Sequence, residues 1–208
     1  MSQLACIASI GRVLERHGIT WWVDSGTLLG LTREARILPW DHDIDLSCWM
    51  PDDGLEPGIF NDLRDLGYRV TSHRLRSEPF VLKMRSRERM PVEVKLWRPL
   101  GDWAWCPVKA PDPAPFVWRL VRLPIRMLWQ HTSVLDRVRL PTMPIGAMRV
   151  PTQFIANLDA LAIEGVSVPV PADATGYLSW RYGDWRVPER DWFYRRDDPA
   201  FVREWPAK

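Results

Sequence analysis

The sequence predicts an α/β fold of the α+β type, with one mixed β-sheet flanked by helices and a loop-rich C-terminal half. Apolar residues recur at helical spacing near the start of the chain, and short alternating or β-branched runs between residues 21 and 97 are typical of strands. Most of the 19 prolines lie after residue 90. We expect residues 1–100 to form the core, and residues 101–208 to be a helical, loop-rich C-terminal part of the same domain.

The amino-acid composition argues against several classes of protein. With 208 residues, 46% of them hydrophobic, the chain is long enough to bury a core of its own. A formal net charge of +2 gives no overall field of the kind that a general nucleic-acid binder uses. Its three cysteines are far apart, which argues against a disulfide framework or a structural zinc site. With neither a signal peptide nor a membrane span apparent, we expect a cytoplasmic protein.

The opening segment predicts an amphipathic helix from Ser2 to about His17, because its apolar residues share one helical face and Gly18 follows as a natural stop. Residues 21–23 form a short aromatic and β-branched run that predicts a strand. A tight turn at residues 25–27 then leads into a short apolar helix.

Residues 43–48 alternate acidic and apolar side chains, which is the period of a strand with one carboxylate face and one core face. A helix over residues 56–66 is expected to end at Gly67. The next runs predict strands at residues 68–72, 80–85 and 92–97. One helix followed by three strands favours a mixed sheet.

The C-terminal half gives weaker patterns. Phe116–Trp129 predicts a basic amphipathic helix, because its arginines share one face. Further along, we expect a helix over residues 152–161, an extended segment at 165–168, a rigid loop at 169–171 and a short helix at 177–182.

The acidic strand carries the chemistry. Asp41, Asp43 and Asp45 occupy every second position, so on a strand they project from one face and repel one another unless a cation or solvent compensates. Magnesium prefers oxygen ligands and takes one or two protein carboxylates, a role that fits Asp43 and Asp45. A solvated acidic turn is the alternative. A calcium loop is excluded, because Leu46 and Asp52 stand where it requires Gly and Glu.

Two further features could complete such a site. Ser25, Gly26 and Thr27 at a strand-to-helix turn offer free backbone N–H groups to a phosphate, although Ser25 or Thr27 could equally serve as a simple helix cap. Glu93 lies on a predicted strand and could stand beside Asp43 and Asp45 as a third carboxylate, either as metal ligand or as general base. The alternative for Glu93 is a surface residue on an edge strand.

These residues resemble the LicD and fukutin-related family. Its signature is a Gly-Thr-Leu-Leu-Gly turn, a basic residue, and then Pro-Trp-Asp-x-Asp-Ile-Asp-Leu. The chain has the turn at residues 26–30, Arg33, and the acidic segment at residues 39–46. A second block, Val-Pro-Val-Pro at 168–171 followed by Tyr-Leu at 177–178 and Tyr-Gly-Asp-Trp at 182–185, also matches the family pattern.

The resemblance implies a nucleotidyltransferase-like fold, with residues 1–100 as the catalytic core and residues 101–208 binding the acceptor. Known members transfer a phospho-alcohol, such as phosphocholine or ribitol phosphate, from a CDP-linked donor to a sugar hydroxyl. Gly26 and Thr27 are then expected to cradle a phosphate. Residues 98–150 match nothing in the family, and we expect them to carry acceptor specificity.

The resulting hypothesis is an Mg²⁺-dependent phosphotransferase of LicD type, with Mn²⁺ as the alternative ion. Asp43 and Asp45 are the expected metal ligands, Glu93 the third ligand or base, Asp41 the base or a support for the ligands, and Arg33 and Lys83 the phosphate partners. The expected partners are a CDP-linked donor and a glycan or lipid-linked glycan. Residues 116–129 are expected to contact a membrane surface peripherally.

Two other functions use the same residues. A nucleotidyltransferase would move a nucleoside monophosphate instead of the alcohol phosphate, because the same metal strand serves either cleavage. A non-catalytic module would use the pocket only to bind a nucleotide or carbohydrate, and the retention of all three strand aspartates speaks against it.

Overall fold

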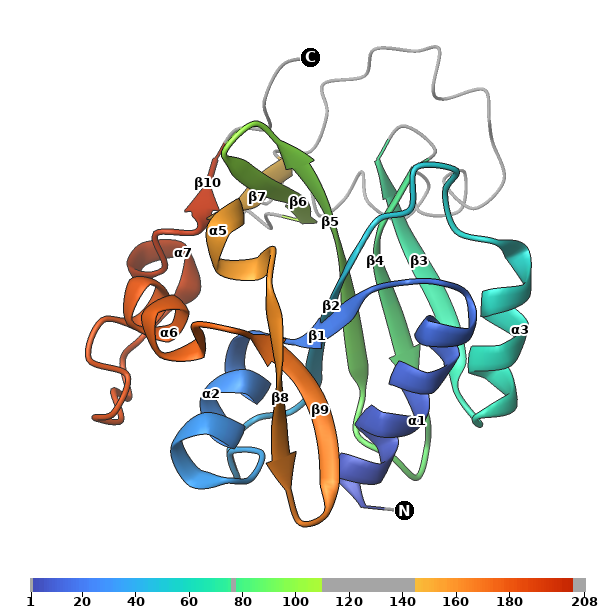
Figure 1. Cartoon of the computed structure of the whole chain (residues 1–208), viewed down its shortest axis with the longest axis horizontal. Helices are drawn as coiled ribbons and strands as arrows, with labels where there is room; N and C mark the ends of the chain where they lie inside the picture. Colours follow the sequence, from blue (N-terminus) through green and yellow to red (C-terminus); the bar gives the residue numbers. More distant parts are fainter. Residues whose placement is uncertain (1, 76–77, 110–144, 204–208) are drawn as a thin grey trace, which may run out of the picture.

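The computed structural model confirms the predicted class, an α+β fold with a mixed sheet flanked by helices (Figure 1). It describes residues 2–75, 78–109 and 145–203. The predicted helix at residues 116–129 lies outside these ranges. Among the described helices, none is both long enough and apolar enough to cross a bilayer.

The helices of the N-terminal part follow the predictions closely. They are α1 (Gln3–Arg16), α2 (Ser25–Glu34) and α3 (Pro57–Asp65). In the C-terminal part the helices are short: α5 (Thr152–Ile155), α6 (Ala174–Tyr182) and α7 (Tyr194–Asp197). In Figure 1, α1 and α3 lie together on one side of the molecule, and α2 and α6 lie on the other.

The strands of the main sheet come from both halves of the chain. They are β1 (Trp21–Val23), β2 (Ile44–Trp49), β3 (Arg69–Leu75), β4 (Glu78–Arg85), β5 (Val92–Leu100), β6 (Trp103–Lys109), β7 (Ile145–Pro151) and β10 (Phe201–Val202). A separate hairpin is formed by β8 (Leu158–Ile163) and β9 (Val166–Pro171). This hairpin packs beside α1 and β1 (Figure 1).

Strand β5 organises the sheet. Its first residues pair in parallel with β2 on one side and antiparallel with β4 on the other. Its last residues pair with β6. In the sheet, β6 pairs with β7, and β7 pairs with β10. Because β5 ends at Leu100 and pairs with β6, the same sheet contains strands of the N-terminal and the C-terminal parts.

The alternation of β2 separates the core from the opposite face. Ile44, Leu46 and Cys48 are fully buried within the main hydrophobic cluster. Asp45 and Ser47 project from the other side of the strand, as the period of two requires. The sequence therefore placed the carboxylate face correctly, although β2 begins at Ile44, one residue later than predicted.

The C-terminal half contains more strand than the sequence suggested. β6 and β7 were not predicted, and the helix expected over residues 152–161 ends at Ile155 and gives way to β8. The rigid loop expected at 169–171 is wrong as well, because this segment is the end of β9. Within the part of the chain that the structure describes, β9 pairs with β8 alone. A strand with one free edge tolerates proline, whose missing N–H can face away from the partner.

The contact of α1 with β1 generates a stability prediction. A Cβ atom on Gly11 would come within 1.9 Å of the ring of the buried Trp21. We expect Gly11→Ala to lower the free energy of unfolding by about 1–3 kcal/mol, as overpacking of a tight core does. Gly58→Ala in α3 is the matched control, because its Cβ would meet its nearest neighbour at an ordinary 3.4 Å. Denaturant titration of both variants measures the difference, and equal stabilities would contradict the close approach.

Candidate active site

A large cavity opens over the carboxylate face of the sheet. Its walls come from the start of α2, the loop before β2, strands β4 and β5, and the segment from α6 to residue 194. Its volume of about 1980 Å³ exceeds the roughly 300–1,000 Å³ of most ligand pockets. All four carboxylates that the sequence singled out line it: Asp41, Asp43, Asp45 and Glu93.

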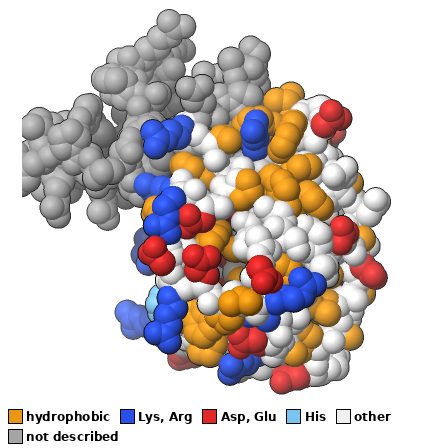
Figure 2. Space-filling view, turned by 90° about the vertical axis from the view of Figure 1, so that its left-hand side faces the viewer, with side chains coloured by type: hydrophobic (Ala, Val, Ile, Leu, Met, Phe, Trp, Pro, Cys, Tyr) orange, Lys and Arg blue, Asp and Glu red, His pale blue; other side chains and the backbone are white. Residues whose placement is uncertain are grey.

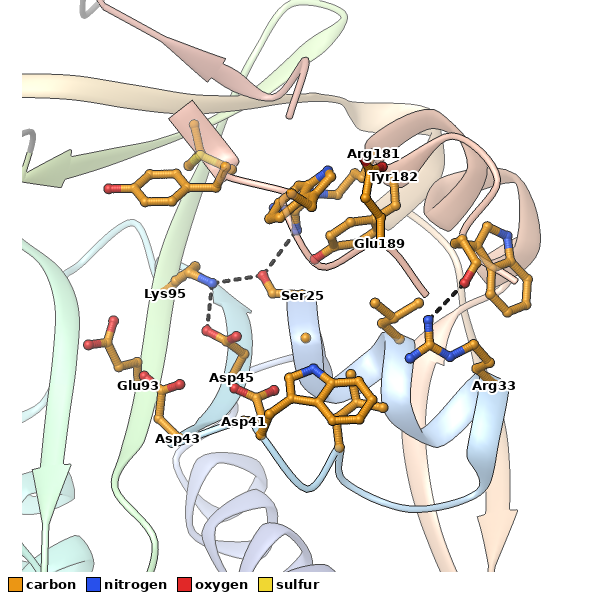
Figure 3. A pocket seen from close by; sticks show the side chains of 18 of the residues that line it. Ser25, Arg33, Asp41, Asp43, Asp45, Glu93, Lys95, Arg181, Tyr182 and Glu189 are labelled. Atoms are coloured by element: carbon orange, nitrogen blue, oxygen red, sulfur yellow. Dashed lines mark hydrogen bonds and ion pairs between the residues drawn. The ribbon is translucent and has the colours of Figure 1, made fainter. Parts of the chain in front are cut away.

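Strand register brings two of these carboxylates together. Asp45 on β2 is the direct partner of Glu93 on β5, and Glu93 is in turn the partner of Lys83 on β4. Asp41 and Asp43 lie in the segment that enters β2. Figure 3 shows the four carboxylates gathered at one end of the cavity.

Two of the carboxylates are already paired with lysines. Lys95 Nζ donates to Asp45 Oδ1 at 2.8 Å, and Lys83 forms an ion pair with Glu93. Among the described residues, none forms a hydrogen bond or ion pair with the Asp43 carboxylate. Asp43 is therefore the carboxylate that is left to a ligand.

The protonation equilibria reflect this crowding. Burial, followed by the charges of Asp45, Glu93 and Asp41, raises the pKa of Asp43 to about 6. Burial and the Asp45 charge also raise the pKa of Asp41. For Lys95, burial by itself lowers the pKa, but the carboxylates of Asp45 and Asp24 outweigh it, so the pKa stays above its usual range and the ammonium group is charged.

The residues fit one divalent cation bound by two carboxylates. In the described part of the chain, no group of three or more His, Cys, Asp or Glu side chains is arranged to hold a metal ion. Asp43 and Asp45 line the same cavity, and Asp45 retains an oxygen that does not bond to Lys95. Magnesium needs only one or two protein carboxylates. A cation here would stabilise the charged form of Asp43, whose pKa is raised by burial and then by its acidic neighbours. The ion pair with Lys83 makes Glu93 less available than the sequence suggested.

The turn before α2 is capped by Asp24, and not by Ser25 or Thr27. Asp24 is the helix cap and accepts from the Ser25 N–H at 2.6 Å, whereas Ser25 has a left-handed φ of 51°. Gly26 lies against Asp41, since a Cβ there would come within 2.5 Å of Asp41 Oδ2. Thr27 is fully buried, and its hydroxyl accepts from the Asp45 N–H at 2.9 Å. Ser25 and Gly26, but not the side chain of Thr27, therefore face the cavity.

The hydroxyl of Ser25 joins two cations. Lys95 Nζ donates to Ser25 Oγ at 2.8 Å, and Arg181 Nη1 donates to the same oxygen at 3.0 Å. A hydroxyl oxygen accepts two such bonds, which leaves its O–H free to donate to a ligand. Arg181 comes from α6, so the C-terminal part contributes directly to this end of the cavity.

Behind Ser25, Asp24 is fully buried in a polar cluster. It accepts hydrogen bonds from Ser47 Oγ at 2.5 Å, from the Tyr177 hydroxyl at 2.8 Å and from Arg181 at 3.3 Å. Burial by itself raises the pKa of Asp24, but Arg181 and Lys95 outweigh it and hold the pKa below its usual range. Arg181 also forms an ion pair with the buried Asp198.

The two predicted phosphate partners lie on the cavity wall, with different surroundings. Arg33 donates to the Trp185 backbone carbonyl at 3.0 Å and pairs with Glu34, which places it on the side of the cavity away from the carboxylates (Figure 3). Lys83 is engaged with Glu93. Both stay predictions as phosphate partners.

The wall opposite the sheet is aromatic. Tyr182, Trp185, Trp192 and Tyr194 line it, and Trp40 is 58% exposed at the carboxylate end. Such rings offer flat apolar surfaces for a base or sugar. On the face shown in Figure 2, acidic side chains lie beside basic ones and no area of a single charge dominates.

Sequence reasoning named Ser25 but missed Lys95 and Arg181 as residues of this end of the cavity, and Asp24 behind them. Lys95 had a usable signal, because it lies two residues after Glu93 and so shares its strand face. Arg181 had none. Its partners Asp24 and Ser25 are more than 150 residues away in the sequence.

Part of the chain matches a known family. Residues 18–98 match the family described as LicD/FKTN/FKRP, nucleotidyltransferase domain. The match confirms the family resemblance over this range, which contains Asp41, Asp43, Asp45 and Glu93. The second block, at residues 168–185, lies outside the matched range.

Individual relatives are similar over shorter stretches. A segment of 42 residues, 20% of the chain, is 45% identical to Ribitol 5-phosphate transferase FKRP of Mus musculus and of Homo sapiens and covers 8% of each. An uncharacterized protein of Rickettsia typhi is 33% identical over 63 residues, 30% of this chain and 20% of that one. The chain thus matches a small fraction of the length of these relatives.

Among solved structures, a lincosamide antibiotic adenylyltransferase, LnuA, with lincomycin bound, aligns with a TM-score of 0.44 and 12% identity over 86% of this chain and 85% of its own.

The raised pKa of Asp43 makes the stability of the cation-free protein depend on pH. The pKa of Asp43 is about 6 in the folded chain, against the usual 3.8. Between these two pH values the folded chain therefore binds more protons than the unfolded chain. The stability that this proton binding contributes is lost as the pH rises through 6. We expect Asp43→Asn to be more stable than the wild type at pH 7 in the presence of a chelator. This difference in stability should shrink as the pH falls towards 4. Denaturant titration measures this, with the exposed Asp53→Asn as control. Equal stability at pH 7 argues against crowded carboxylates.

Arg181 is expected to be essential for stability. Arg181→Met leaves Asp24 and Asp198 buried without their cation, so we expect a loss of about 3–5 kcal/mol in the free energy of unfolding. Arg16→Met is the control, because Arg16 is 64% exposed in its ion pair with Asp62 and should cost less than about 1 kcal/mol. Similar losses in the two variants would show that the buried cluster is not held by Arg181.

Proposed function

From the LicD/FKTN/FKRP nucleotidyltransferase domain at residues 18–98, we propose that this protein is an Mg²⁺-dependent transferase. It moves a phospho-alcohol, such as ribitol phosphate or phosphocholine, from a CDP-linked donor to a hydroxyl group of a glycan or lipid-linked glycan. The identity of 45% to a ribitol 5-phosphate transferase over 42 residues supports the choice of reaction.

One observation carries the proposal. Asp43 and Asp45 converge at the end of a cavity whose adjoining wall is the Ser25–Gly26 turn. A hard cation bound by two carboxylates beside a helix N-terminus and a polarised hydroxyl is a recurring arrangement for holding a diphosphate. All of these residues lie within the matched domain.

The proposed roles follow from the contacts. Asp43 and Asp45 hold the cation, which supplies charge neutralisation at the transferring phosphoryl group. Ser25 and Gly26 bind phosphate oxygens through the free O–H and the backbone. Asp41 is the proposed base, because it lies against Gly26 and its raised pKa brings it closer to the range in which a carboxylate accepts a proton.

In the proposed reaction the oxygen of the acceptor hydroxyl attacks the phosphorus that carries the alcohol. A new P–O bond forms to the acceptor, the P–O bond to the CMP group breaks, and the hydroxyl proton passes to a carboxylate. The products are CMP and a phosphodiester between the alcohol and the acceptor. The cavity has room for donor and acceptor together, and the aromatic wall at residues 182–194 is the proposed site for their rings.

The C-terminal part is the proposed acceptor-binding region, since it supplies the wall opposite the carboxylates. Peripheral contact with a membrane through residues 116–129 would suit a lipid-linked acceptor. A cytoplasmic location is consistent with a CDP-linked donor and belongs to the same proposal.

Two labelled forms of each donor test the reaction. CDP-ribitol and CDP-choline, labelled separately in the alcohol and in the cytosine, are incubated with Mg²⁺ and a panel of glycan acceptors. We expect the alcohol label to move to the acceptor while the cytosine label leaves as CMP. We further expect Asp43→Asn and Asp45→Asn each to lower kcat about 10²–10³-fold, in line with the loss of one electrostatic contact in a transition state.

The other outcomes identify the alternatives. Transfer of the cytosine label indicates nucleotidyl transfer. Donor binding, detected as thermal stabilisation, without movement of either label indicates a binding module. Asp53→Asn is the control for both variants, because Asp53 is exposed in the turn after β2 and should leave kcat unchanged.

A further inference from the structure

We propose that Lys95 is a built-in cation that limits the site to one divalent ion. This inference rests on the proposed function, since it concerns the same carboxylates. It assigns Lys95 as a positioning residue: its ammonium group holds Asp45 in place and occupies the position at which a second ion would share that carboxylate.

Lys95 is fixed from two sides. Its Nζ donates to Asp45 Oδ1 and to Ser25 Oγ, both at 2.8 Å, and its side chain is only 14% exposed. Ser25 is itself held by Arg181, so the ammonium group cannot swing away without breaking a buried cluster. Figure 3 shows Lys95 between Asp45 and Ser25, facing the carboxylate end of the cavity.

The charges at this end of the cavity are only partly balanced. Its lining includes the four carboxylates, which give four negative charges, and Lys83, Lys95 and Arg181, which give three positive ones. Arg181 is also paired with Asp24 and Asp198, which lie behind it in the buried cluster. Lys95 therefore supplies, directly at Asp45, positive charge that a second ion would otherwise supply.

The geometry disfavours a second ion at Asp45. In sites with two metal ions, the ions lie about 3.5–4 Å apart, so a carboxylate beside the first ion would have to serve the second as well. Two of the carboxylates in reach, Asp45 and Glu93, are register partners on β2 and β5. One oxygen of Asp45 bonds to Lys95, and Glu93 is paired with Lys83. A second dication near Asp45 would also meet the repulsion of the Lys95 ammonium group.

Lys95 is a stronger constraint than Lys83. The Lys83 side chain is 29% exposed, about twice as much as that of Lys95, and Glu93 is its one ion-pair partner among the described residues. It can therefore turn towards solvent or a phosphate at lower cost. Removing the Lys95 charge takes one positive charge from this end of the cavity and frees one oxygen of Asp45.

Counting bound Mn²⁺ tests the inference without an assay of turnover. The number of Mn²⁺ ions per chain is measured by the loss of the free-ion EPR signal, with no donor present. We expect one ion for the wild type and two for Lys95→Gln, which retains a polar side chain near Ser25 and Asp45 but loses the charge. Lys95→Arg keeps the charge and should bind one ion.

A control removes a positive charge elsewhere in the cavity. Arg33→Gln leaves the carboxylates and Lys95 untouched, because Arg33 contacts the Trp185 carbonyl and Glu34. It should bind one ion. A second ion in Lys95→Gln then reflects the position of the lost charge and not the loss of net charge alone.

The contrary results separate the two proposals. Two Mn²⁺ ions on the wild type overturn the role of Lys95 and leave the proposed metal-dependent function standing. One ion on Lys95→Gln, at any affinity, also overturns it. No Mn²⁺ on the wild type overturns the metal site itself, and with it both proposals. The wild-type count needs no variant, so the inference stays testable even if Lys95→Gln fails to fold.

Discussion

The burial of Asp24 governs how the parts of this protein are held together. Its carboxylate is fully buried at the junction of β1 and α2, and the groups that bond to it come from α2, β2 and α6. A buried carboxylate deprived of its partners costs several kcal/mol, so these segments must meet for the chain to fold. The consequence is that α6, some 150 residues downstream, is fixed to the start of α2 and supplies one wall of the cavity.

Carboxylates are paired with cationic side chains both in the interior of the protein and at the floor of the cavity. In the interior, Asp24 and Asp198 share the guanidinium group of Arg181, and this pairing is structural. At the cavity floor, Asp45 and Glu93 have lysine partners while Asp43 has none among the described residues. Burial, together with the charges of its acidic neighbours, raises the pKa of Asp43. Ser25 connects the two levels, because its hydroxyl bonds to Arg181 on one side and to Lys95 on the other. A site with an unmet negative charge beside a rigid, paired framework is suited to take up a cation with little rearrangement.

Particular elements show where sequence patterns sufficed and where they did not. The period of β2 placed Asp45 opposite the core correctly, since side chains of a strand alternate whatever the neighbouring strand is. The Gly-Thr pair was located at the right turn, but the Thr27 hydroxyl bonds to the Asp45 backbone and Ser25 faces the cavity in its place. Which of the two hydroxyl groups faces the cavity depends on the φ of 51° at Ser25, and no pattern of residue types specifies that angle. Proline at positions 169 and 171 suggested a loop, yet both lie in a strand because β9 pairs along one edge only.

By itself the sequence determined the helices and strands of residues 2–100, the acidic face of β2 and the turn that faces it, because these depend on the order of near neighbours along the chain. The tertiary structure decided which charges meet. Lys95 reaches Asp45 only because β5 pairs in parallel with β2, after a helix and two strands have intervened. Arg181 reaches Asp24 only because α6 packs on α2. Such contacts are set by the closure of long loops and by the packing of the core, and local periodicity carries no information about either.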